Sequence, residues 1–381
     1  MKILPLPEIV IGKNVLKEVP AVLKKISGRR VMVVTDPGLK KAGILKPLEA
    51  VLNEAVQEII VFDEVAPDPS IELVSRVVDL AKKEKVDAVI GLGGGSPIDT
   101  AKVAAALVTN TKNIEAYFGI DLLEKNALPI IAIPTTAGTG SEVTPIAILS
   151  DEEEKLKKGI VSSKIIPQYA FLDPVLTVGL PPAVTAATGM DALTHAIEAY
   201  TSVNASPYSD ALSLKAMYLI KGNLKRAFDD GKDVAVRENM LLGSLLAGMA
   251  FAHAGVAAVH AFAYPLGGMF HIPHGLANTL MLATIMEFNI IGSEQKYKDI
   301  AIALGVADEN IKPEMAIEVV RELKDSLDMP KSLADINIPK DSIGKLAEGA
   351  MKVTRLLANN PRQINLEDAK KLYETAYATA W

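Results

Sequence analysis

The first 178 residues alternate short β-rich runs with helical patterns, and this alternation limits the possible folds more than any other feature of the sequence. The β-rich runs are dominated by valine and isoleucine and end in polar or glycine-rich turns, which is typical of strands buried on both faces. Strands that alternate with helices build a parallel sheet covered by helices. The helices are expected at 39–55 and 70–85, and the strands at 30–36, 58–63, 86–95 and 128–136, with further β-rich pieces between 145 and 173.

The pattern changes after "LTVGLPP" (176–182), where strand signals fade and helical patterns rich in alanine, leucine and methionine begin. A chain of 381 residues exceeds one ordinary hydrophobic core. We therefore expect an α/β domain over 1–178 and an all-helical domain over 179–381. The charged segment "DEEEKLKK" (151–158) is interpreted as a loop or a hairpin between strands.

Charge and composition exclude several classes of protein. A net charge of −6 argues against a general nucleic-acid or anionic-membrane partner. The absence of cysteine excludes disulfides and thiolate ligands and fits the cytoplasm, as does an N-terminus without a signal-like apolar run. Residues 240–286 contain no Asp, Glu, Lys or Arg and are long enough to span a bilayer. Because they hold four histidines, prolines and repeated glycines, we interpret them as buried helices of a domain outside the membrane.

A glycine-rich loop follows the strand at 86–95 and opens a helix. Its residues Gly93, Gly94 and Gly95 let the backbone approach an anion closely, with Ser96 expected as helix cap and Pro97 in the first helical position. The free N–H groups at that helix end favour a pyrophosphate. The spacing is not G-x-G-x-x-G, so a tight structural turn explains the loop equally well.

Two further features favour a nucleotide. Asp36 ends the strand at 30–36, where a carboxylate can accept a hydrogen bond from a ribose 2′-hydroxyl and repel a 2′-phosphate, although a helix cap explains it equally well. Asp36 precedes the glycine loop, which is not the ordinary Rossmann order. "PTTAGTGSE" (134–142) is a second loop of small residues, and four of its hydroxyls can donate to phosphate or ribose: Thr135, Thr136, Thr139 and Ser141.

"TGMDALTHAIEAY" (188–200) predicts a helix with Asp191 and His195 one turn apart on one face. That spacing suits two ligands of one metal ion. A carboxylate among apolar neighbours needs a cation or several hydrogen-bond donors. The alternative is an Asp–His pair inside a hydrophobic core.

"HAFAYPLGGMFHIPHG" (260–275) contains three of the five histidines of the chain. For any one of them a core or capping role is the commoner explanation. Asp191, His195, His260 and His274 together would supply one carboxylate and three imidazoles, a set that suits Fe²⁺, Zn²⁺, Co²⁺, Ni²⁺ or Mn²⁺. Four candidates in one uncharged region favour a metal site.

Four motifs together resemble the iron-containing (group III) alcohol dehydrogenases: "GGGSPID", "PTTAGTGSE", "GMDALTHAIEAY" and "HAFAYPLGGMFHIPHGLAN". The resemblance runs almost end to end, to "NNPR" (359–362) and the closing "LYETAYATAW". It implies an N-terminal α/β dinucleotide-binding domain and an all-α C-terminal domain with the active site between them, as in dehydroquinate-synthase-like folds. It also implies at least a homodimer, formed through the N-terminal strands.

The resemblance assigns roles to individual residues. The metal would be held by Asp191, His195, His260 and His274. The adenosine end of the dinucleotide would contact Asp36 at the ribose and Asp68 near the adenine. The pyrophosphate would contact Gly93, Gly94, Gly95 and Ser96, with Asp99 nearby. Thr135, Thr136 and Thr139 would line the cofactor, and Lys158 would reach the nicotinamide ribose.

Two positions depart from the pattern of some family members. Tyr264 lies four residues after His260, where several members carry a histidine thought to assist proton transfer, and His253 replaces a common asparagine. The proton relay copied from the family is therefore in doubt, and Tyr264, His271 or a water chain are the candidates here.

The resemblance implies reversible oxidation of a primary alcohol to an aldehyde by hydride transfer to a nicotinamide. Asp36 favours NAD(H) over NADP(H), and Fe²⁺ is the favoured metal. Phe251, Phe270 and Met249 are candidates for an apolar pocket wall, with plain helix packing as the alternative.

Three alternatives remain. A zinc polyol (glycerol-type) dehydrogenase would usually have a smaller metal set. A dehydroquinate-synthase-like lyase would need Lys and Arg near the metal, and residues 240–286 contain neither. A non-catalytic nucleotide-binding protein would bind NADH without turnover.

Overall fold

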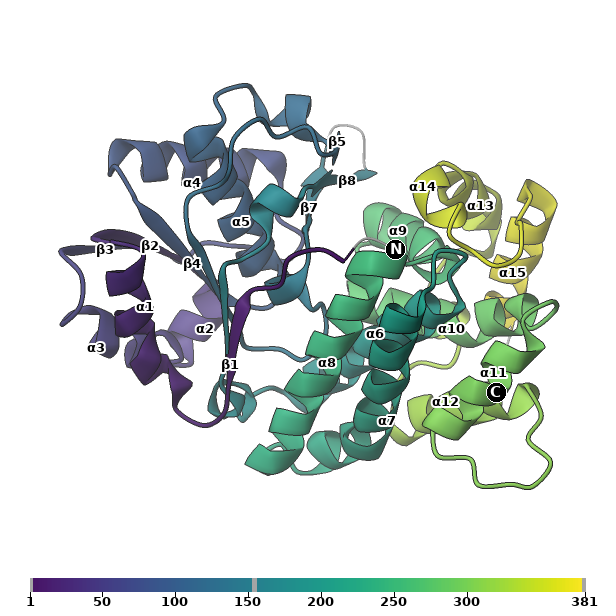
Figure 1. Cartoon of the computed structure of the whole chain (residues 1–381). Helices are drawn as coiled ribbons and strands as arrows, with labels where there is room; N and C mark the ends of the chain where they lie inside the picture. The colour runs from purple at the N-terminus through teal and green to yellow at the C-terminus, as the bar shows by residue number, and fades with distance from the viewer. Residues whose placement is uncertain (1–2, 153–155, 379–381) are drawn as a thin grey trace. The chain divides into compact units, whose positions relative to one another are not determined.

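The computed structural model describes residues 3–152 and 156–378 (Figure 1). These residues form two compact units. The first unit consists of Ile3–Thr136 and Gly140–Gly179. The second consists of Ala137–Thr139 and residues from 180 onward.

A six-stranded parallel sheet forms the centre of the first unit, which confirms the predicted α/β class. The four buried strands predicted between residues 30 and 136 are all present. The strand order is β1-β9-β6-β4-β2-β3, with β1 at Glu8–Ile11, β2 at Arg30–Val34, β3 at Glu58–Phe62, β4 at Ala88–Gly93, β6 at Ile130–Pro134 and β9 at Tyr169–Leu172.

Helices cover both faces of this sheet, and the alternation of side chains along β2 shows how. Val31 and Val33 pack with α1 (Val19–Lys25) and α3 (Leu45–Leu52) in one hydrophobic cluster. Met32 and Val34 point to the opposite face and pack with α4 (Ile71–Lys83) and α5 (Gly95–Thr109) in another. Successive residues of a strand point to opposite faces, so a strand buried on both sides needs an apolar residue at every position.

Two details of the predicted helices are wrong. The single helix expected over 39–55 is two helices, α2 (Pro37–Lys41) and α3, because the backbone turns between them at Gly43, whose φ of 77° favours glycine. Ser96 is not the cap of α5. The helix begins at Gly95, two residues earlier than the expected Pro97, with Gly94 as its N-cap.

A small sheet of order β5-β8-β7 completes the first unit (β5, Gly119–Ile120; β7, Ile146–Asp151; β8, Leu156–Val161). Strands β7 and β8 are antiparallel, so the charged segment 151–158 connects a hairpin. Residues 153–155 of that segment lie outside the described residues.

The second unit is helical, as the sequence predicts. Helix α8 (Val234–Ala254) is long and apolar enough to cross a membrane by length and composition, but it packs against α6 (Pro182–Thr201) and α7 (Pro207–Asp229), and most of it is buried. The long helices of this unit are α6 (Pro182–Thr201), α7 (Pro207–Asp229), α8 (Val234–Ala254), α9 (Ala258–Phe270), α10 (His274–Asn289), α11 (Glu294–Ala303), α12 (Glu314–Ser326), α13 (Ile343–Met351) and α15 (Leu366–Ala378).

Candidate metal centre and nucleotide loops

Helix α6 presents Asp191 and His195 on its buried face, one turn apart. Pro182 starts the helix, where its missing N–H costs nothing, and small residues such as Ala192 and Ala196 let neighbouring helices approach. Both side chains are at least 95% buried, at 3% and 5% exposure. The predicted pair is therefore an interior feature of the second unit.

Helices α9 and α10 bring the other two predicted ligands to the same place. His260 lies in the first turn of α9, and His274 is the first residue of α10. The chain turns between these helices at His271, whose φ of 55° ends α9 in a left-handed conformation. A helix end followed directly by a new helix places His274 beside His260, with ring centroids 5.2 Å apart.

The four side chains converge on one point. Each offers one ligand atom, and all four atoms lie within 4.8 Å of one another. Nε2 of His260 and Nε2 of His274 lie 3.9 and 3.7 Å from Oδ1 of Asp191. Ligands of one ion at about 2.1 Å are separated by roughly 3 to 4 Å, so a small adjustment of the side chains would bind a divalent metal.

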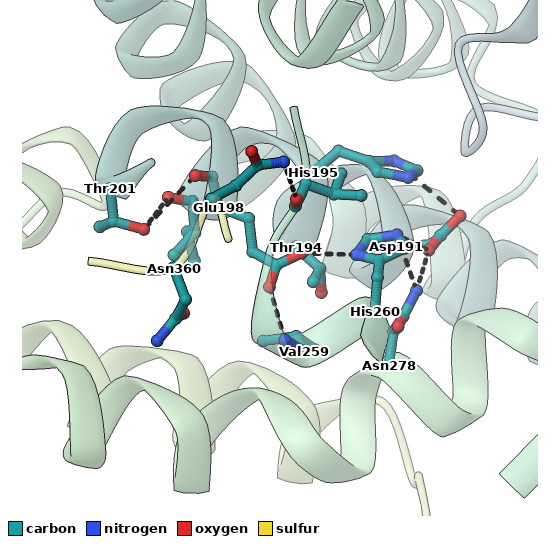
Figure 2. Close-up of polar contacts among 12 residues, drawn as sticks. Asp191, Thr194, His195, Glu198, Thr201, Val259, His260, Asn278 and Asn360 are labelled. Carbon is teal, nitrogen blue, oxygen red and sulfur yellow. Dashed lines mark hydrogen bonds and ion pairs between the residues drawn. The ribbon is translucent and has the colours of Figure 1, made fainter. Parts of the chain in front are cut away.

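Asn278 provides an independent test of whether a cation fits here. Its Nδ2 donates to Oδ1 of Asp191 at 2.7 Å and lies 3.2 Å from Nε2 of His260 (Figure 2). The same Nδ2 lies 3.1 Å from Nε2 of His274. Nδ2 thus has two hydrogens for three neighbouring atoms, while Oδ1 of Asn278 is buried without a partner. A cluster with more acceptors than donors is what a bound cation requires.

The protonation states also suit metal binding. Burial lowers the pKa of His195 to about 4, so its imidazole is neutral and can offer a lone pair at neutral pH. Burial by itself would raise the pKa of Asp191, but the three neighbouring histidines bring that pKa below its ordinary value. The Asp191 carboxylate is therefore ionised. The ring of Phe251 stacks on the His195 ring, with 4.4 Å between the centroids.

Glu198 is a buried side chain at the centre that the sequence motifs do not single out. Its carboxylate accepts hydrogen bonds from Nδ1 of His260 and from the backbone N–H of Val259, both at 2.6 Å (Figure 2). The available signal was its spacing, since Glu198 follows Asp191 by seven residues and His195 by three on the same helix face.

The glycine loop of the first unit has the close packing expected of an anion-binding turn. At Gly93 φ is 154°, and a Cβ there would lie 2.5 Å from Cγ of Pro97. A Cβ on Gly94 would lie 3.2 Å from Oγ1 of Thr136, and the backbone N–H of Thr135 donates to the carbonyl of Gly93 at 3.0 Å. The two predicted loops therefore lie side by side at the ends of β4 and β6.

Ser96 and Asp68 are brought together in the same unit. The backbone N–H of Asp68 donates to Oγ of Ser96 at 3.2 Å, and the Asp68 carboxylate pairs with Lys157 of β8. Asp68 has a φ of 54°, an uncommon conformation for a non-glycine residue. The adjacent Lys158 pairs with Asp151 at 2.7 Å.

Asp99 of α5 is hydrogen-bonded to the residues that follow β6. One of its oxygens accepts from Oγ of Ser141, and the other accepts from the backbone N–H of Ile148 at 2.9 Å. Lys102, fully buried on the same helix, donates to Oγ of Ser141 at 2.8 Å. Asp99 therefore fixes the loop that carries the hydroxyl groups.

The remaining predicted residues are divided between the two units. Asp36, at the end of β2, accepts from the backbone N–H of Leu39 at 3.0 Å through Oδ1, so the helix-cap interpretation is correct, and Oδ2 makes no part of that cap. Thr139 belongs to the second unit. Of the two relay candidates, Tyr264 lies near His274, with centroids 6.1 Å apart, and His271 is exposed.

Comparison with known proteins gives the class. The family profile "Iron-containing alcohol dehydrogenase" matches residues 7–174, and "Fe-containing alcohol dehydrogenase family, C-terminal" matches residues 185–377. The chain is 40% identical over 375 residues to long-chain-alcohol dehydrogenase 1 of Geobacillus thermodenitrificans, covering 97% of this chain and 94% of that protein.

Two solved structures agree. The crystal structure of 1,3-propanediol oxidoreductase covers 99% of this chain and all of its own, with a TM-score of 0.96 and 36% identity. Sulfoacetaldehyde reductase from Bifidobacterium kashiwanohense, solved in complex with NAD⁺, covers both chains fully, with a TM-score of 0.89 and 29% identity. The chain belongs to the iron-containing alcohol dehydrogenase family. It is a metal-dependent alcohol dehydrogenase, as the resemblance of its motifs predicts.

Proposed function

We propose that this enzyme interconverts primary alcohols and aldehydes with NAD(H), using Fe²⁺ held by Asp191, His195, His260 and His274. The observation that carries the proposal is the convergence of four buried ligand atoms within 4.8 Å of one another. One carboxylate and three imidazoles form a donor set for a divalent transition metal. The names of the three related proteins all refer to compounds with a primary hydroxyl or an aldehyde, or to long-chain alcohols.

The two units divide the work in this proposal. Residues 1–178 bind the dinucleotide and residues 179–381 bind the metal. When bound, the divalent ion supplies a Lewis acid for the substrate oxygen and the nicotinamide supplies a hydride acceptor. The chain keeps His195 neutral by burial and keeps Asp191 ionised, and the ring of Phe251 covers one face of the His195 ring. Tyr264 and His271 are the candidates to pass a proton to solvent.

The cofactor contacts are proposed as the family resemblance assigns them. The pyrophosphate would bind at Gly93, Gly94, Gly95 and Ser96, where α5 begins with free N–H groups. Thr135, Thr136 and Thr139 would line the cofactor and Lys158 would reach the nicotinamide ribose, with Asp68 at the adenine and Asp99 positioning the loop. NAD(H) is preferred over NADP(H) because Asp36 carries a negative charge where a 2′-phosphate would bind. The NAD⁺ complex of the related reductase supports the same choice.

We also propose a homodimer in the cytoplasm. Strand β1 pairs only with β9 among the described strands, so its other edge is free. Free edges of strands favour pairing with a second chain, and exposed apolar residues flank this one: Ile3, Leu6 and Ile11. Light scattering of the purified enzyme would show twice the mass of 40.6 kDa, whereas a monomer would contradict the proposal.

The experiment that tests the reaction is anaerobic. Protein stripped of metal is reloaded with Fe²⁺ or Zn²⁺, and the absorbance of NADH or NADPH is followed with butanal. We expect oxidation that requires metal, is fastest with Fe²⁺ and prefers NADH. A stripped protein that oxidises NADH as fast as the reloaded one would contradict the proposed metal centre.

The ligand assignment needs its own variant. His260→Ala should lose stoichiometric metal and at least about a thousandfold in turnover, because a Lewis acid stabilises several kcal/mol of charge. His253→Ala is the matched control, since His253 lies on α8 and bonds the carbonyl of Met249. Normal metal content in His260→Ala would show that the assignment is wrong.

A further inference from the structure

Glu198 is a buried carboxylate outside the proposed ligand set. It is 3% exposed, and both of its oxygens have partners across the helix packing: Oε1 with the backbone N–H of Val259 and Oε2 with Nδ1 of His260, each at 2.6 Å. In the described part of the chain, no lysine or arginine pairs with Glu198 or with Asp191. Burying a carboxylate costs free energy unless a cation or hydrogen-bond donors compensate its charge. The two donors that Glu198 contacts therefore indicate its role.

The contact with His260 determines which ring nitrogen faces the centre. A carboxylate opposite Nδ1 requires a proton on that nitrogen, which leaves Nε2 as the free lone pair. Nε2 is the atom on the side of the cluster, 3.9 Å from Oδ1 of Asp191 and 3.2 Å from Nδ2 of Asn278. Glu198 therefore selects the tautomer of His260 that can bind a metal.

The second contact fixes the carboxylate itself. Val259 is the residue before His260, and its N–H belongs to the first turn of α9, where backbone donors have no partner inside the helix. A carboxylate bound to that N–H stays in one place relative to the His260 ring. The α6 helix thus holds both the imidazole and the backbone that carries it.

We propose that Glu198 is a positioning residue of the metal centre, which binds the Nδ1–H of His260 and the N–H of Val259 so that Nε2 of His260 points at the metal. The inference rests on the proposed metal centre. Carboxylates that orient a metal-binding histidine change metal affinity by about 10- to 100-fold. Glutamine in place of Glu198 could accept from only one of the two donors. Its NH₂ group would favour the opposite His260 tautomer, with the proton on Nε2.

The first test measures metal affinity. Zn²⁺ is titrated against a chelating indicator in the wild type, in Glu198→Gln and in Glu318→Gln, which removes the same charge from an exposed site on α12. We expect a dissociation constant about 10- to 100-fold higher for Glu198→Gln and unchanged for Glu318→Gln, with equal NADH affinity in all three. A constant within twofold of the wild type in Glu198→Gln would overturn the inference.

The second test needs no substitution at Glu198 and so does not depend on the folding of that variant. The chain has five histidines, so ¹⁵N-histidine labelling of the zinc-loaded wild type gives a short NMR spectrum. We expect His260, assigned from His260→Gln, to carry its proton on Nδ1 with a strongly deshielded resonance. A His260 that lacks a proton on Nδ1 would refute the role of Glu198. A wild type that binds no zinc would instead refute the metal centre itself.

Discussion

Asp36 illustrates how one side chain can serve both structure and specificity. Oδ1 caps α2 through the N–H of Leu39, which leaves the other oxygen for the proposed ribose contact. The two interpretations of this residue that are equally good from sequence alone are therefore compatible. A substitution that tests cofactor choice has to account for the cap.

We expect Asp36→Ser and Asp36→Gly to shift cofactor preference toward NADPH. Both remove the charge that would repel a 2′-phosphate. Serine retains the cap, and glycine costs only a few tenths of a kcal/mol relative to a good capping residue. The ratio of kcat/KM for NADPH over that for NADH should rise at least tenfold, which corresponds to about 1.4 kcal/mol. An unchanged ratio in both variants would show that Asp36 does not read the ribose.

At this scale the sequence predicts residues whose chemistry is visible in the chain order. Asp191 and His195 are predicted from their spacing of one helical turn, and His260 and His274 from their position in a stretch without charged residues. Glu198 and Asn278 could not be assigned in the same way, since their roles depend on contacts between α6, α9 and α10. Asn278 resembles any buried asparagine until its three acceptor neighbours are known.

Among the helices, the contact of α10 with α6 sets the width of the metal centre. Gly275, the second residue of α10, packs so closely on α6 that a Cβ there would lie 2.3 Å from the carbonyl oxygen of Ala187 and 3.4 Å from Cβ of Asp191. This glycine is needed for close approach rather than for an unusual backbone angle. The neighbouring His274 depends on the same approach.

Gly275→Ala should therefore separate α10 from α6 and move His274 away from Asp191. We expect at least tenfold weaker Zn²⁺ binding and a loss of about 1 to 3 kcal/mol in unfolding free energy, as for other overpacked sites. Gly222→Ala, in α7 with no atom near the new Cβ, is the control and should stabilise slightly. Equal zinc affinity in Gly275→Ala and the wild type would contradict this account of the packing.

Helix α5 and the loop after β6 carry a second set of buried charges, Lys102 and Glu142. Burial raises the pKa of Glu142 to about 7 and lowers the pKa of Lys102 to about 8. Between pH 4.5 and 7 the folded protein then holds a proton on Glu142 that the unfolded chain has lost. This carboxyl group consequently makes the fold less stable as pH rises through that range.

Glu142→Gln removes that dependence. We expect the variant to gain stability relative to the wild type between pH 5.0 and pH 7.5, by at most about 3 kcal/mol. Urea unfolding followed by circular dichroism at both pH values measures the difference. Glu115→Gln, an exposed carboxylate in the same unit, should show no such change. A constant difference between Glu142→Gln and the wild type would mean that Glu142 is ionised throughout.

The elements themselves were largely predictable, and the exceptions have local causes. Strands buried on both faces, such as β2 and β4, can be recognised in the sequence as unbroken apolar runs. The break between α2 and α3 could not be predicted because the apolar residues of "KKAGILK" keep the spacing of a helix across Gly43. The start of α5 differs by two residues because Gly94 takes the capping position without a side-chain hydrogen bond, whereas capping propensity alone assigns that position to Ser96.

For the whole molecule, metal binding is expected to act mainly on one of the two units. All four proposed ligands belong to the helical unit, so a metal that binds only the folded form adds about 2.7 kcal/mol to its stability at one hundred times the dissociation constant. Hydrogen exchange should slow in α6, α9 and α10 when zinc is added. The α/β unit should change little.

His260→Ala treated with the same zinc is the control and should show no added protection. Slowed exchange confined to the α/β unit would contradict the proposed location of the metal. The two-part organisation that underlies this prediction follows from the change of pattern near residue 178, whereas the membership of Ala137–Thr139 in the helical unit has no signal in the sequence.

Helix α6 carries two of the proposed ligands and the residue proposed to orient a third within eight consecutive positions, which limits how this stretch can change in length during evolution. One residue inserted or deleted between Asp191 and Glu198 would turn everything beyond it by about 100° around the helix axis. No compensating substitution elsewhere could return His195 and Glu198 to the same face together. We therefore expect relatives that retain the metal centre to have no insertion or deletion between Asp191 and Glu198. Exposed loops of the protein remain free to vary in length.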